Sequence, residues 1–227
     1  MLKRLFGTIV AAAILLASLP AQAVELNYGY DVSYPQGNRV TSLPIPGPFT
    51  VVGVNGGRAF YANEYLSGLL QWAGPNAELY LNTGNPGPVV RAWETAPRLQ
   101  SWPAGVTAQS TLGNKTCDSL VPDSLECAYV YGYLAAQDSF AKAKTVFDAK
   151  GWGNLTARTW WLDVETVNSW RGLDRTGAYF VDQGLTREAS QALNVEYIKG
   201  SVYFLRSIAQ VKAVGIYSTS YQWGLIT

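Results

Sequence analysis

The sequence predicts an α/β fold of the TIM-type (β/α) barrel class, incomplete at its C-terminus. Short apolar runs alternate with amphipathic segments, a pattern that indicates parallel strands joined by helices. The predicted strands end in polar or glycine-rich segments, which is where parallel α/β proteins place their sites. A doubly wound sheet shares this alternation, but the NGG sequence at residues 55–57 lacks the spacing of a phosphate-binding glycine loop. About five strands are predicted, whereas a closed barrel has eight.

The N-terminal segment, residues 1–23, has the pattern of a secretory signal peptide. Lys3 and Arg4 precede an apolar run over residues 5–19, and the sequence AQA at 21–23 fits a cleavage site. An uncleaved anchor is the alternative, although the apolar run is short for a membrane span. We therefore expect a secreted domain over residues 24–227 that keeps no stable membrane anchor.

The first half of this domain is predicted to contain three strands and one helix. Proline and glycine residues predict a loop over residues 43–48. Asn63 is a candidate cap for the helix, and Gly74-Pro75 is expected to end it. In order, the elements are a strand over 27–33, a loop over 43–48, a strand over 49–54, a helix over 64–72 and a strand over 77–82.

The second half begins with an irregular stretch over residues 88–123 that contains Trp93 and Trp102. Apolar residues at three- and four-residue steps then predict a helix, and Thr186 is a plausible cap for another. The remaining elements, in order, are a helix over 133–147, a strand over 157–165, a loop over 168–184, a helix from 186 to about 211 and a strand over 214–218.

Cys117 and Cys127 are the only two cysteines of the chain. In an oxidising compartment we expect them to form a disulfide that closes a small surface loop, and two free thiols are the alternative.

Composition excludes several functional classes. Charged residues make up 15% of the chain and the formal net charge is +1, which argues against a nucleic-acid partner. The absence of histidine excludes Ser-His-Asp and Cys-His catalysis and disfavours a zinc enzyme, so we expect neither a metal nor a cofactor. Acid–base chemistry then falls to Asp, Glu, Tyr or Lys. The 8 Trp and 14 Tyr suit either a core or a carbohydrate groove.

Two acids stand at the end of the predicted strand at 157–165. Side chains alternate along a strand, so Asp163 and Glu165 are expected to share one face, with Trp161 deeper on it as core filling. Two carboxylates held close titrate at separate pKa values, as a general acid beside a carboxylate requires. The alternative is a structural ion pair with Arg158 or Arg171.

Three short motifs stand in order along the chain: YDVSYPQG at residues 30–37, LDVE at 162–165 and GIYS at 215–218. With these motifs the chain resembles the lysozyme-type glycoside hydrolases of family 25, which are (β/α) barrels. The resemblance implies cleavage of the β-1,4 bond after N-acetylmuramic acid in peptidoglycan.

The resemblance also implies roles for particular residues. Glu165 matches the proton donor of the family, and Asp163 and Asp31 match the carboxylates that orient the substrate and offset positive charge. We expect four further residues to line the substrate groove: Asn55, Asn82, Tyr217 and Trp170.

Two other functions remain open at this point. A non-catalytic barrel that binds cell walls or glycans would keep the fold without turnover, and a structural surface protein would show neither binding nor turnover. The expected partner of both the hydrolase and the glycan-binding barrel is a polysaccharide.

Overall fold

The computed structural model describes residues 28–85, 107–109, 115–118, 124–174, 176–181 and 184–227. The expected signal peptide and the residues Trp93 and Trp102 lie outside these ranges. Within them, no helix is long and apolar enough to cross a membrane.

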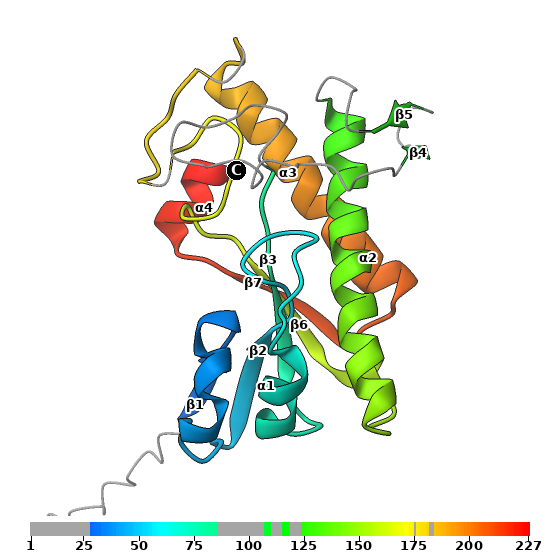
Figure 1. Cartoon of the computed structure of the whole chain (residues 1–227). Coiled ribbons are helices and arrows are strands. Elements are labelled where there is room, and N and C mark those ends of the chain that lie inside the picture. The colour runs from blue at the N-terminus through cyan, green and yellow to red at the C-terminus, as the bar shows by residue number, and fades with distance from the viewer. Residues whose placement is uncertain (1–27, 86–106, 110–114, 119–123, 175, 182–183) are drawn as a thin grey trace, which may run out of the picture.

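A parallel sheet of five strands forms the centre of the molecule (Figure 1). Its order is β1-β2-β3-β6-β7, so the strands are neighbours in the order in which the chain visits them. This confirms the predicted α/β class with a parallel sheet. The strands are β1 (Gly29–Val32), β2 (Phe49–Gly53), β3 (Glu78–Asn82), β6 (Thr159–Asp163) and β7 (Ala213–Tyr217).

Helices separate most of these strands. A 3-10 helix (Tyr34–Ser42) follows β1, and a π-helical turn (Phe204–Ile208) extends α3. The predicted cap Thr186 is confirmed, because its side chain accepts a hydrogen bond from Ala189 N. The α-helices are α1 (Leu66–Ala73), α2 (Leu125–Ala149), α3 (Arg187–Tyr203) and α4 (Ser220–Ile226).

Three local features differ from the sequence-based expectation. Asn63 is not the cap of α1, since its side chain bonds the backbone of Tyr65 and Gly53 ahead of the helix. The region expected to be irregular contains the antiparallel pair β4 (Ala108–Gln109) and β5 (Thr116–Cys117). The short helix α4, which the sequence did not predict, is capped by Thr219.

The core lies between one face of the sheet and the helices. Leu79 and Leu81 on β3 are fully buried, and so are Trp160 and Leu162 on β6. The residues that alternate with them, Tyr80 and Trp161, are half-buried and lie on the other face of the sheet. Phe140 of α2 packs on Trp160 with their rings 5.6 Å apart. The alternation leaves the opposite face of the sheet to the side chains that build the candidate site.

The predicted disulfide is confirmed. Cys117 on β5 and Cys127 in the first turn of α2 are bonded, with their Cα atoms 5.5 Å apart. The bond joins the small β4–β5 pair to the helix layer.

Helices α2 and α3 pack closely because glycines stand at their crossing (Figure 1). A Cβ atom on Gly132 would lie 1.9 Å from the carbonyl oxygen of Tyr197, and one on Gly200 would lie 1.9 Å from that of Tyr129. Ser201 Oγ also donates to the carbonyl of Gly132 across this contact, at 2.9 Å. The two helix backbones therefore touch without intervening side chains.

We expect Gly132→Ala to lower the free energy of unfolding by about 1–3 kcal/mol, because the added methyl must push the backbones apart. Urea unfolding of the whole chain measures the change. Gly224→Ala in α4 is the matched control, since no atom lies within 4 Å of its Cβ position and alanine favours a helix. An unchanged stability of Gly132→Ala would contradict the close contact.

Candidate active site

A cavity of about 530 Å³ lies on the face of the sheet opposite the core. Its floor is formed by β1 and by alternate residues of β2, β3 and β6, and its walls by residues that follow β1 and β6 and by the end of β7. The lining residues are Gly29, Tyr30, Asp31, Ser33, Tyr34, Pro35, Phe49, Val51, Glu78, Tyr80, Asn82, Trp161, Asp163, Glu165 and Tyr217.

The three acids expected to act together, Asp31, Asp163 and Glu165, all line this cavity. Asp31 lies on β1, Asp163 is the last residue of β6, and Glu165 follows two residues later. The parallel register places Asp163 between Asn82 of β3 and Tyr217 of β7. Residues far apart in sequence thus meet because the carboxyl ends of parallel strands lie at one end of the sheet.

The strand itself ends at Asp163, earlier than the predicted Glu165. Val164 N still donates to the carbonyl of Tyr217 at 2.8 Å, but the carbonyl of Glu165 accepts bonds from Asn168 N and from the indole of Trp170. The chain therefore turns at Glu165 and is held there by the loop that follows.

Asp163 is a buried carboxyl, with 5% of its surface exposed. Asn82 Nδ2 donates to its Oδ2, while the buried Oδ1 has no hydrogen-bond partner among the described residues. Burial, followed by the nearby charge of Glu165, raises the pKa of Asp163 to about 7. This group consequently holds a proton at mildly acidic pH, where an ordinary aspartate does not.

The other groups at the same end of the cavity respond to the same negative field. Burial and then the charge of Glu165 raise the pKa of Asp31. The pKa of Tyr217 is raised first by the charge of Glu165, and that of Tyr80 first by burial, with the three acids adding to it. The acids therefore form one electrostatic unit.

Asn55 and Trp170, expected to contact substrate, do not line the cavity and are fully buried. The side chain of Asn55 bonds both backbone groups of Asn82, donating to its carbonyl at 3.0 Å and accepting from its N–H at 3.1 Å. Trp170 Nε1 donates to the carbonyl of Glu165 at 2.8 Å, and its ring packs edge-on against Tyr197. Both residues therefore hold the backbone of a residue that lines the cavity: Asn55 holds Asn82, and Trp170 holds Glu165.

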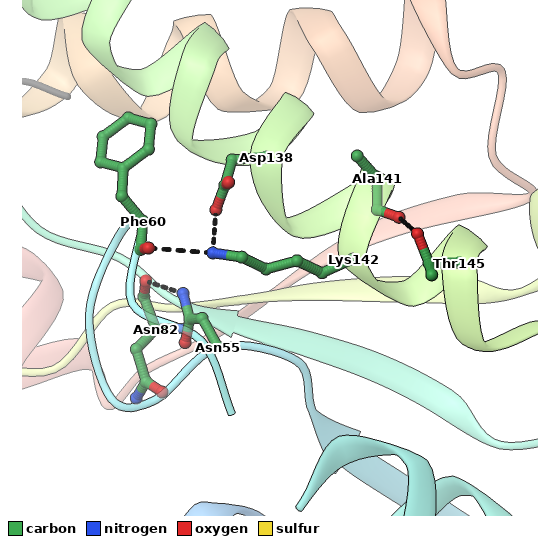
Figure 2. A network of polar contacts seen from close by, with 7 residues as sticks. All are labelled: Asn55, Phe60, Asn82, Asp138, Ala141, Lys142 and Thr145. Atoms are coloured by element: carbon green, nitrogen blue, oxygen red, sulfur yellow. Dashed lines mark hydrogen bonds and ion pairs between the residues drawn. The ribbon is translucent and has the colours of Figure 1, made fainter. Parts of the chain in front are cut away.

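Figure 2 shows how the loop after β2 is tied to α2 as well as to β3. Lys142 Nζ donates to the carbonyl of Phe60 at 2.9 Å and forms an ion pair with Asp138 one turn earlier on α2. Asn55 stands at the base of the same loop and bonds Asn82. The loop is thereby fixed between the helix layer and the strand that carries Asn82.

Trp161 lines the cavity, which corrects the expectation that it fills the core. Its Nε1 donates to Glu78 Oε2 at 2.7 Å. A Cβ on Gly215 would lie 2.4 Å from the ring of Trp161, so this glycine provides the space for the indole to lie across β7. Glu78 and Tyr80 also line the cavity but were not among the predicted site residues. The alternation of polar and apolar residues in ELYLN at 78–82 could have indicated them, because it places both on the same face as Asn82.

Neither arginine considered as an ion-pair partner lines the cavity. Arg158 donates to Asn76 Oδ1 at 2.9 Å, and the backbone N–H of the buried Arg171 bonds Asn194. Among the described residues, no group of three or more Asp, Glu, Cys or His side chains is arranged to hold a metal ion.

The chain matches no protein-family model, and comparisons with curated proteins and with solved structures find no match. The geometry of the cavity therefore carries the functional argument by itself.

Proposed function

We propose that the protein is a secreted glycoside hydrolase that cleaves β-1,4 bonds in peptidoglycan or a related amino-sugar polymer. The observation that supports this most strongly is the meeting of Asp31, Asp163 and Glu165 in one cavity that also contains aromatic rings. Two or more carboxyl groups around one bond are the machinery with which most glycosidases work, and flat rings suit sugar faces.

In the proposed reaction, Glu165 donates its proton to the glycosidic oxygen as the bond from that oxygen to the anomeric carbon breaks. Ionised Asp31 stabilises the positive charge that develops on the sugar ring, and Asp163, held by Asn82, orients the substrate. Water then supplies the hydroxyl group of the new reducing end, and its remaining proton returns to the carboxylate.

A (β/α) barrel related to the family 25 hydrolases is the architecture we propose for this site. Strands neighbouring in chain order, helices packed on one face and a polar cavity on the other are all features of such a barrel. The disulfide supports a location outside the cytoplasm.

Incubation of the whole chain with purified peptidoglycan and with chitin tests the proposal. We expect new reducing ends to appear with at least one polymer, together with shortened chains in mass spectra. Binding to the polymer without new reducing ends would favour the non-catalytic glycan-binding alternative, and the absence of both would reject a glycan function.

A further inference from the structure

The charges that line the cavity all have one sign. Four carboxylates line it, those of Asp31, Glu78, Asp163 and Glu165, whereas no lysine or arginine of the described residues does so. Six aromatic rings line it as well, and the face of such a ring attracts cations. The six are Tyr30, Tyr34, Phe49, Tyr80, Trp161 and Tyr217.

Glu78 lies apart from Asp163 and Glu165, whereas the strand register sets it level with Val51 and Asp31. It begins β3, four residues before Asn82, which pairs with Asp163, so about 13 Å of strand separates Glu78 from the level of Asp163. The ring of Tyr80 comes from the strand position between them. The hydrogen bond from Trp161 Nε1 fixes the Glu78 carboxylate in the floor of the cavity.

A second observation concerns a buried oxygen of the lining. Asp163 lines the cavity and is only 5% exposed, and its Oδ1 has no hydrogen-bond partner among the described residues. A buried oxygen of this kind costs free energy until a donor reaches it. Hydroxyl and ammonium groups are such donors, whereas an anionic group would be repelled by the ionised carboxylates of the lining.

We propose that the cavity binds a glycan whose sugars carry free amino groups, and that Glu78 binds an ammonium group of that glycan away from the bond that is cleaved. This inference rests on the proposed glycan function and narrows it to de-N-acetylated amino sugars. Polymers of uronic acids, whose carboxylates are free, are disfavoured for the same reason. A single ammonium needs one carboxylate and nearby rings, and both are present around Glu78.

Glu78→Gln is a sharp test because the glutamine amide oxygen can still accept the hydrogen bond of Trp161 while the charge is lost. Titration calorimetry with the whole chain, at about pH 6, compares a β-1,4 glucosamine hexamer with its fully N-acetylated counterpart. We expect wild type to bind the glucosamine hexamer about tenfold more tightly, and Glu78→Gln to lose most of that preference while binding the acetylated hexamer as before.

Glu196→Gln is the matched control, since it removes one charge from α3 outside the cavity and should keep the preference. Equal binding of both hexamers by wild type, or an equal loss for both in Glu78→Gln, would overturn the inference. Because calorimetry detects binding even when no turnover occurs, a protein that discriminates but does not cleave would reject the hydrolase proposal alone. One that cleaves without discriminating would reject only the role of Glu78.

Discussion

Glu165→Gln is expected to lower the rate of glycan cleavage by about 10²–10⁴-fold and to leave glycan affinity within about twofold of wild type. Glutamine fills the same space but cannot donate the proton that the leaving oxygen requires. The backbone of residue 165 should stay in place, because Trp170 and Asn168 bond its carbonyl and not its side chain. Initial rates of reducing-end release and calorimetric binding of the same polymer separate the two effects.

Glu64→Gln, which removes an exposed acid outside the cavity, is the control and should cleave at the wild-type rate. Loss of affinity in proportion to loss of rate would mean that Glu165 only binds substrate. If Glu165→Gln kept its activity while Asp163→Asn lost it, the role of proton donor would pass to Asp163, whose pKa near 7 suits it for that role.

Asp163→Asn is expected to make the folded protein more stable than wild type above about pH 7 and to change stability little near pH 4. The pKa of Asp163 rises from 3.8 to about 7 on folding, mainly because of burial. A raised pKa means that the protonated form is favoured in the folded state, so wild type loses stability as the pH rises from 3.8 through about 7. The full shift corresponds to an upper bound of about 4 kcal/mol, and we expect about 1–4 kcal/mol.

Urea unfolding of both proteins across this pH range measures the difference. Asp174→Asn provides a control of opposite sign, because a hydrogen bond from Thr176 and further backbone bonds lower the pKa of Asp174. That variant should be less stable than wild type above the ordinary pKa of an aspartate, and the difference should disappear as the pH falls below that value. A constant difference between wild type and Asp163→Asn at all pH values would show that Asp163 is not held in an unfavourable charge state.

The sequence could predict the meeting of the acids because it follows from a general property of parallel sheets. Once the runs around Asp31 and Asp163 are read as parallel strands, their carboxyl ends must lie at one end of the sheet. The alternation of buried and exposed residues then selects the face. The disulfide was predictable for a similar reason, since the chain contains only two cysteines.

The direction of individual polar and aromatic side chains was harder to predict, since it depends on contacts between distant segments. Asn55 and Asn82 both end predicted strands, but only Asn82 reaches the cavity, since Asn55 bonds the backbone of the neighbouring strand. Trp161 looks like a core residue in sequence and faces the cavity because Gly215, 54 positions later, makes room for it. No local pattern contains that information.

The two hydrogen bonds from Asn55 to Asn82, with the bond from Asn63 to the carbonyl of Gly53, fasten both ends of the loop that follows β2. Between these anchored residues, Gly57 lies against Tyr34, which lines the cavity. Residues 56–58 are therefore the positions of this loop at which to vary the sequence, since Ala59 is buried in the core. If the protein acts on glycans as proposed, substitutions there are expected to alter which polymers are recognised, while the anchoring asparagines and the acids stay unchanged.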